Sequence, residues 1–275
     1  YQVKTNTNYK CHNCGASMSF NNFIKQIDPT LHKQYTMEKF KEGYTGKNFV
    51  VEEPKLEFKK PVFKKELDLP RASEVPIAKE YLEKRMLDPT KFYFAKKFRT
   101  WVNSKKRTFD SVQKDESRII IPMYDTERNL IGFQGRALGP NFVKYITVML
   151  KDDAPKVFGL EQIDKTKTVY VTEGPFDSTF IRNSIAMCGA DGDVRGWGIS
   201  RPVWVYDNEP RSSEILKRIE STIDRGECVV IWPQNIKEKD INDMVLSKYD
   251  IMSILELNTY SGLEAKVKFN NWKKV

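Results

Sequence analysis

The sequence lacks any apolar run of the roughly 18 residues that a membrane span needs, and no secretion signal is visible. Cysteine is scarce, with four in 275 residues and one closely spaced pair. These absences argue against a membrane protein and a disulfide-stapled secreted scaffold, and they favour a reducing, cytoplasmic compartment. Cys188 and Cys228 lie in apolar runs and are expected to be buried. Because Tyr1 stands first instead of methionine, we expect further sequence upstream.

The chain is rich in basic residues, with 46 Lys and Arg against 37 Asp and Glu and a net charge of +9. Hydrophobic residues make up 40% of the chain and aromatic residues 12%, which is enough for a substantial core. A basic chain favours a polyanionic partner such as a nucleic acid. A well-solvated surface is the simpler explanation of the same excess, so charge alone leaves both interpretations open.

Hydrophobic periodicity and loop composition divide the chain into five segments. Residues 47–70 are rich in Lys, Glu and Pro with little periodicity, which is typical of an extended linker. From about residue 166 short apolar runs alternate with helical patterns, which is typical of a parallel β-sheet. The expected segments are a small N-terminal domain at 1–46, the linker at 47–70, a basic α+β subdomain at 71–165, an α/β domain at 166–247 and a helical segment at 248–275.

The same patterns place individual elements. We expect a β-hairpin at 118–137, with residues 144–148 continuing its sheet. Helices are expected at 18–27 and 76–86, where apolar residues recur on one face. In the C-terminal half the expected strands are 168–172, 185–188, 203–206 and 228–232, the expected helices are 176–183, 212–225 and 240–247, and one or two closing helices follow at 248–268.

Acidic residues follow several of the predicted strands, and the carboxyl ends of parallel strands converge in one crevice. Two carboxylates about 5 Å apart repel by roughly 3 kcal/mol at an effective dielectric of 20, so a divalent cation best stabilises such a cluster. Oxygen ligands alone favour Mg²⁺ or Mn²⁺. We therefore expect a metal-dependent phosphoryl-transfer site. The acids concerned are Glu173, Asp177, Asp207, Glu209, Asp240 and Asp243.

Each of these acids has a structural explanation when it is taken singly. Asp207 and Glu209 would then be turn residues, and Asp240 would be a helix N-cap. We favour the functional explanation because three acidic groups follow short apolar strands of one predicted sheet.

Cys11 and Cys14 form a Cys-x-x-Cys pair in a predicted tight knuckle, which is typical of half a zinc site. A structural Zn²⁺ needs four ligands. His12 lies inside the knuckle and is poorly placed, and His32 is a candidate third ligand. The zinc site is therefore incomplete in this chain, and we expect the other ligand pair upstream of Tyr1. The alternative is two unmetallated thiols in a turn.

In order and spacing these motifs resemble the bacterial-type DNA primases that contain a Toprim domain. The acidic groups at 173–177, 207–209 and 240–243 are similar to the Toprim motif, and residues 118–146 are similar to the basic subdomain that precedes it. Residues 9–17 resemble the second knuckle of the primase zinc ribbon. The likeness is greatest to the short primases of T-even-type bacteriophages, and it extends over nearly the whole chain.

The resemblance implies an α/β fold with a Toprim parallel-sheet core, preceded by the basic α+β subdomain, and a partial N-terminal zinc ribbon on a linker. It also implies a DNA primase that makes short RNA primers on single-stranded DNA from ribonucleoside triphosphates, working with a hexameric replicative helicase. A phage-encoded enzyme of this kind would act in the cytoplasm of the infected host. The alternatives are a Toprim nuclease and a non-catalytic DNA-binding protein with zinc and Toprim domains.

For the acids, the resemblance implies that Glu173, Asp207 and Glu209 are catalytic, and that Asp177 and Asp240 complete the Mg²⁺ or Mn²⁺ site. Glu173 would be the general base or a shared metal ligand. The family's usual Asp-x-Asp is Asp-Asn-Glu here, so we expect a shifted metal geometry. The third acidic patch is shorter than in most relatives, which leaves the role of its second acid open.

For the cations, Arg118, Arg136 and Lys144 match the basic positions of the primase subdomain and would bind triphosphate or template. Otherwise they are sheet-edge cations. The run at 91–99 interleaves aromatic and basic residues, which suits stacking on single-stranded nucleic acid. About half of its aromatic residues are expected in the core instead.

Overall fold

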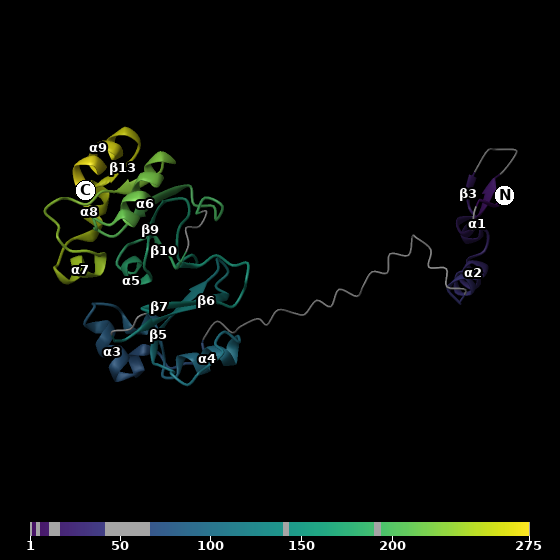
Figure 1. Ribbon diagram of the computed structural model, residues 1–275, viewed down its shortest axis with the longest axis horizontal. Coiled ribbons are helices and arrows are strands. Elements are labelled where there is room, and N and C mark those ends of the chain that lie inside the picture. Colours follow the sequence, from purple (N-terminus) through teal and green to yellow (C-terminus); the bar gives the residue numbers. More distant parts are fainter. Residues whose placement is uncertain are drawn as a thin grey trace. The chain divides into compact units, whose positions relative to one another are not determined.

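The chain folds into two compact units, Tyr1–Lys60 and Pro61–Val275 (Figure 1). The computed structural model describes residues 2–3, 6–10, 17–41, 67–139, 143–189 and 194–274. Within those ranges, no helix combines the length and the apolar character of a membrane span.

The first unit contains a three-stranded antiparallel sheet and two helices. The aromatic ring of Tyr9 stacks on that of Phe23 with 3.9 Å between ring centroids, which joins sheet to helix. Ser19 caps the first helix by accepting a hydrogen bond from Asn22 N at 3.3 Å, so the helix begins two residues later than predicted. The second helix was not predicted, because its apolar residues do not share one face. The elements are β1 (Gln2–Val3), β2 (Asn6–Lys10), β3 (Ser17–Ser19), α1 (Phe20–Ile27) and α2 (Pro29–Lys41).

The predicted zinc ligands Cys11 and Cys14 lie outside the described residues, as does His12, so the zinc site stays a prediction. His32 lies on α2, where its Nε2 is 3.0 Å from Asn21 Oδ1.

The second unit begins with an antiparallel sheet of four strands in the order β4-β5-β6-β7. The predicted hairpin is confirmed, because Arg118 pairs with Ala137 and Tyr124 with Leu130. The predicted helix at 76–86 ends early, at Glu83. The elements are η1 (Ala72–Glu74), α3 (Pro76–Glu83), η2 (Pro89–Lys91), β4 (Tyr93–Ala95), α4 (Phe98–Lys105), β5 (Arg118–Tyr124), β6 (Leu130–Ala137) and β7 (Tyr145–Met149).

A six-stranded sheet follows, in the order β13-β12-β11-β9-β10-β8. Its four central strands are parallel, as predicted, and the two edge strands pair antiparallel. The strands are β8 (Val157–Phe158), β9 (Thr168–Thr172), β10 (Ser184–Met187), β11 (Arg201–Val205), β12 (Cys228–Val230) and β13 (Thr259–Tyr260), and the helices are α5 (Pro175–Ser178), α6 (Ser213–Asp224), α7 (Ile241–Leu246), α8 (Ile251–Leu257) and α9 (Gly262–Trp272).

Strand order positions the site. The chain passes from β9 to β10 on one side and then returns to place β11 on the other side of β9. Strand order therefore reverses at β9 and β11, and ligands bind at the carboxyl ends of such strands in open α/β sheets. The two closing helices bury Ile251, Leu255, Phe269 and Trp272 in the core of this sheet, as expected for residues 248–268.

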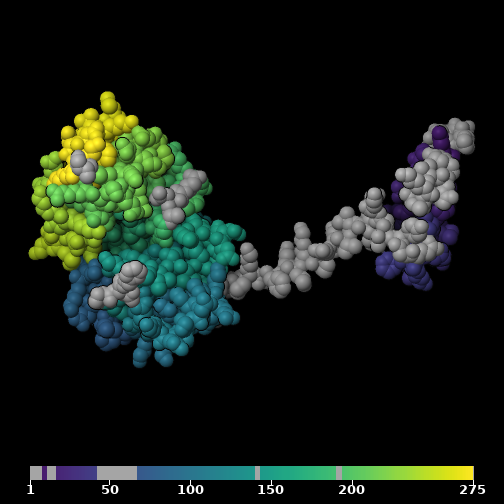
Figure 2. Space-filling view, viewed as in Figure 1, coloured from purple at the N-terminus to yellow at the C-terminus, as the bar shows by residue number. Residues whose placement is uncertain are grey.

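The two sheets of the second unit pack through one apolar cluster. Figure 2 shows the outer surface of the two layers in contact, blue to teal for the first sheet and its helices and green to yellow for the second. Phe92 beside β4 meets Phe176 of α5 edge to face, with 5.5 Å between ring centroids. Cys188 is buried in this cluster, as predicted, whereas Cys228 is only partly buried. Because the apolar contacts are shared, we expect the two sheets to hold a fixed relation at the site between them.

Candidate active site

Glu173 and Asp207 lie together at the carboxyl ends of β9 and β11. These strands pair in parallel with Thr172 opposite Val205, so the residues that follow them emerge side by side. The backbone N–H of Asp207 donates to Glu173 Oε2 at 3.3 Å. The structure thus brings together two acids that are 34 residues apart in the sequence.

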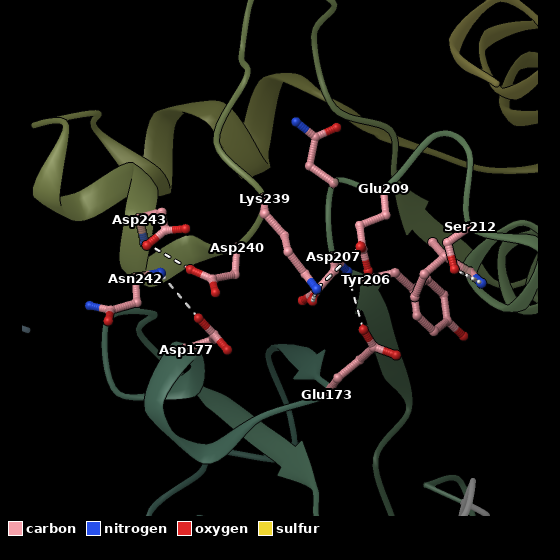
Figure 3. A network of polar contacts seen from close by, with 12 residues as sticks. Glu173, Asp177, Tyr206, Asp207, Glu209, Ser212, Lys239, Asp240, Asn242 and Asp243 are labelled. Atoms are coloured by element: carbon pink, nitrogen blue, oxygen red, sulfur yellow. Dashed lines mark hydrogen bonds and ion pairs between the residues drawn. The ribbon is translucent and has the colours of Figure 1, made fainter. Parts of the chain in front are cut away.

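Asp177 and Asp240 form the other half of the acidic cluster, and their carboxyl groups face one another (Figure 3). Asp177 Oδ1 accepts the backbone N–H of Asn242 at 3.1 Å, near the start of α7. Burial, together with the charge of Asp240, raises the pKa of Asp177 to about 7. Gly174 permits this approach, since a Cβ there would lie 2.9 Å from Asp177 Oδ2.

Asp207 is the acid most perturbed by its surroundings. Burial raises its pKa to about 8, with further contributions from the charges of Glu173, Asp177 and Asp240. Both causes, burial first and the neighbouring acids second, oppose the ionised form of the Asp207 carboxyl group. The site therefore favours a bound cation.

Two side chains partly balance the acids. Arg218 of α6 is ion-paired with Glu173 and also lies 2.9 Å from Glu214. Lys239 Nζ lies 3.1 Å from Glu209 Oε1 and 3.9 Å from Asp207 Oδ2. Burial lowers the pKa of Lys239, but its hydrogen bond to Glu209 and the neighbouring carboxylates raise it by more.

The donor chemistry suits a hard divalent cation, because the cluster consists of carboxylate oxygens. No three His, Cys, Asp or Glu side chains in the described ranges already lie as a ligand set. Two of the acids are instead ion-paired with cations, Glu173 with Arg218 and Glu209 with Lys239. Asp207, with its raised pKa, is the acid best placed to receive a cation without breaking one of these closer pairs.

The remaining predicted acids differ in their surroundings. Asp240 caps α7 by accepting the backbone N–H of Asp243 at 2.8 Å, so the structural explanation for Asp240 also holds. Asp243 is largely exposed. The part of its carboxyl group that is covered and the neighbouring charge of Asp240 together raise its pKa.

The structure corrects the prediction for Arg118. Its side chain is buried in the core, with none of the residue accessible to solvent. The guanidinium is ion-paired with Glu116 and donates to the carbonyl oxygens of Gly135 at 2.7 Å, Val143 at 2.9 Å and Lys144 at 3.3 Å. Arg118 thus ties β5 to β6 and to the start of β7, and it does not reach a nucleotide directly.

The other two predicted cations remain candidates. Arg136 is half-buried, where its Nε donates to the Tyr81 hydroxyl at 3.1 Å and its guanidinium lies 4.6 Å from the ring centroid of Tyr145. Lys144 is exposed. In the run at 91–99, every aromatic side chain is buried, so these rings pack the core and are not available for base stacking.

Sequence reasoning missed Arg218 and did not assign Lys239. Arg218 lies 45 residues after its partner Glu173. Its only sequence signal is its place on the helix that follows Asp207. Lys239 directly precedes the third acidic group, which was its available signal.

No family model matches the chain. The chain is 34% identical to the DNA primase of Enterobacteria phage T4 over 285 aligned positions, which cover 98% of this chain and 82% of that protein.

Solved structures of bacterial primases share the fold. The Aquifex aeolicus primase, with zinc-binding and RNA polymerase domains, matches with a TM-score of 0.50 and 18% identity over 92% of this chain and 74% of that one. The catalytic core of the E. coli primase matches with a TM-score of 0.53 and 19% identity over 74% of this chain and 80% of that one. A DnaG catalytic domain bound to single-stranded DNA matches with a TM-score of 0.50 and 18% identity, over 69% of this chain and 74% of that one.

Proposed function

This chain belongs to the DNA primase family, and from that premise we propose that it joins ribonucleotides on single-stranded DNA at the acidic cluster of Glu173 and Asp207. The observation that carries this proposal is the hydrogen bond between Asp207 N and Glu173 Oε2 at the ends of two parallel strands. It holds two carboxylates where the strand order reverses.

In the proposed reaction the 3′-hydroxyl of one nucleotide attacks the α-phosphorus of the next, and pyrophosphate leaves. Mg²⁺ or Mn²⁺ held by Asp207 with Asp177 and Asp240 would neutralise the phosphates and acidify the attacking hydroxyl. Glu173, the proposed general base, accepts the hydroxyl proton, and Glu209, which is ion-paired with Lys239, would be a further ligand of the metal. Positioning and charge neutralisation supply most of the acceleration.

Cations of the site would hold the triphosphate. Lys239 and Arg218 already lie against the acids. Arg136 lies on β6 of the other sheet, and Lys144 directly precedes β7. Each of these four cations is a candidate to bind a phosphate oxygen in place of its present carboxylate partner or solvent. Arg118 is not a candidate, because its guanidinium is buried and hydrogen-bonded to backbone carbonyl oxygens.

The finer features of the proposal concern the N-terminal unit and partners. We propose that this unit is a zinc ribbon, with Cys11 and Cys14 as ligands, that recognises the template's start sequence. The likeness to the short T-even-type primases supports a hexameric helicase as partner.

The first prediction concerns Glu173→Gln. The variant should lower template-dependent dinucleotide synthesis by at least about 100-fold, because it cannot accept a proton, while stability changes little. Synthesis is measured with single-stranded template, ribonucleotides and Mg²⁺, and Glu220→Gln on the exposed face of α6 serves as the control. Normal primers from Glu173→Gln would refute the assignment, and a shortened template without new RNA would instead indicate a nuclease.

A further inference from the structure

A cavity of about 330 Å³ lies beside Glu173, between the carboxyl ends of β9 and β11 and the facing strands β6 and β7. Aromatic residues Tyr145, Trp204 and Tyr206 line it, together with Glu173 and its partner Arg218. Mostly apolar walls with a few polar groups are typical of small-ligand sites of this size.

Gln134 of β6 also lines this cavity and is 95% buried, with a relative exposure of 5%. Its Nε2 lies 3.0 Å from Thr147 Oγ1, which in turn donates to the carbonyl oxygen of Cys188 at 3.1 Å. Because the Thr147 hydroxyl has one hydrogen and gives it to Cys188, it can only accept from Gln134. This fixes the orientation of the Gln134 amide.

The carbonyl oxygen of Gln134 is therefore the free end of the amide. In the part of the chain that the structure describes, Gln134 Oε1 has no hydrogen-bond partner. A buried acceptor without a donor is unfavourable, and such groups in native proteins call for an explanation. Because this oxygen is itself almost fully covered, a ligand N–H that enters the cavity supplies the missing donor once a side chain of the wall moves aside.

We infer that the cavity receives the base of an incoming ribonucleoside triphosphate, and that Gln134 Oε1 accepts a hydrogen bond from the exocyclic amino group of adenine or cytosine. This inference rests on the proposed function. When a base pairs with a template, adenine and cytosine keep an N–H free on the major-groove edge, whereas guanine and uracil present acceptors there. Gln134 is thus a specificity-determining residue.

The geometry of the cavity supports a base over other parts of the nucleotide. The aromatic residues form walls suited to a planar ring. Glu173 borders the same space, which leaves the sugar and the α-phosphate next to the acidic cluster.

The test compares the binding of ATP with that of purine riboside triphosphate, which lacks only the 6-amino group, to the full chain. Binding is measured by titration of tryptophan fluorescence or by calorimetry. Wild type should prefer ATP by roughly tenfold, and Gln134→Leu should abolish that preference. Gln134→Met is a second variant of similar shape, in case leucine perturbs the fold, and Gln113→Leu at an exposed glutamine is the control.

Several outcomes would overturn the inference. Equal binding of the two nucleotides by wild type would do so, as would a preference that survives in both Gln134 variants. If both variants instead lose discrimination against 2′-deoxy-ATP, Gln134 contacts the ribose and the inference about the base is wrong. Failure of wild type to make primers would sink the proposed function separately, since the binding comparison needs no turnover.

Discussion

Asp207 shows how strongly position alters a single residue of this protein. Its backbone N–H holds Glu173, its carboxyl group lies near three other acids, and Lys239 Nζ is 3.9 Å from its Oδ2. Burial and those acids raise its pKa to about 8. The raised pKa lies above the ordinary value of about 4 for an unfolded chain. Proton binding therefore favours the folded state, and this stabilisation is lost progressively as pH rises from about 4 to about 8.

Asp207→Asn should consequently stabilise the metal-free protein at high pH. We expect the free energy of unfolding to rise by on the order of a few kcal/mol at pH 9 and to change very little at pH 3, because asparagine mimics the neutral carboxyl group. Chemical unfolding in EDTA at both pH values measures this. A gain that did not depend on pH would contradict the assignment, and Asp224→Asn at an exposed acid is the control.

Substitution of Arg218 tests whether primer synthesis depends on the orientation of the Glu173 side chain. Arg218→Ala should lower primer synthesis about tenfold or more, because the Glu173 carboxylate loses the cation that holds it. Arg218→Lys should restore part of the activity, and the pH profile of synthesis should shift in the alanine variant. Lys217→Ala is the control, because it removes one positive charge from an exposed neighbouring residue. If Lys217→Ala lowers primer synthesis equally, the loss reflects the net charge of the protein and not the orientation of Glu173.

Among the elements, the β5–β6 hairpin supports the site by tight packing. Arg118 lies in its core and Gly135 lies against the ring of Phe98, where a Cβ would come within 2.5 Å. Close packing here leaves no room for an added methyl group.

Gly135→Ala should therefore destabilise the second unit by about 1–3 kcal/mol, because the added Cβ forces Phe98 or the strand to shift. Thermal unfolding provides the measurement. Gly139→Ala, where an added Cβ meets nothing within 4 Å, should be close to neutral. If the two variants were equally stable, the argument from packing would be wrong.

In the molecule as a whole, the last helix is connected to the site through Asn208. Asn208 lies between Asp207 and Glu209 in the turn that follows β11, and its side chain bonds to other elements than theirs. It accepts Trp272 Nε1–H at 3.2 Å and donates to the carbonyl oxygens of Ile236 at 3.2 Å and Glu238 at 3.0 Å. The C-terminal helix and the loop before α7 thus fix the segment that carries the acids.

Asn208→Ala should destabilise the second unit by about 2–4 kcal/mol and should also lower primer synthesis, because several buried hydrogen bonds are lost at once. Trp272→Phe keeps the ring and removes one N–H, so about 1 kcal/mol is expected. Urea unfolding measures both variants, with the exposed Asn271→Ala as the control. If Asn208→Ala were no less stable than Asn271→Ala, Asn208 would not connect the last helix to the site in this way.

Much of the fold could be predicted because its causes are local. The strand at 168–172, the hairpin at 118–137 and the closing helices follow from apolar periodicity and turn residues nearby in the chain. Where local signals were short or absent the predictions failed. The two-residue strand β13 depends on pairing with β12. The helix predicted at 176–183 is present only as α5, which stops at Ser178, and the chain turns at Asn183, with φ of 55°, directly before β10.

The sequence by itself determined which acids follow which strands, and with strand polarity that was enough to expect Glu173 beside Asp207. Only the tertiary structure decided how the charges are balanced: Arg218 on Glu173, Lys239 on Glu209, and Arg118 inside the core. The reason is that the ion-pair partner of a cation depends on which distant elements pack against it, and this packing cannot be predicted from the residues next to the cation in the sequence.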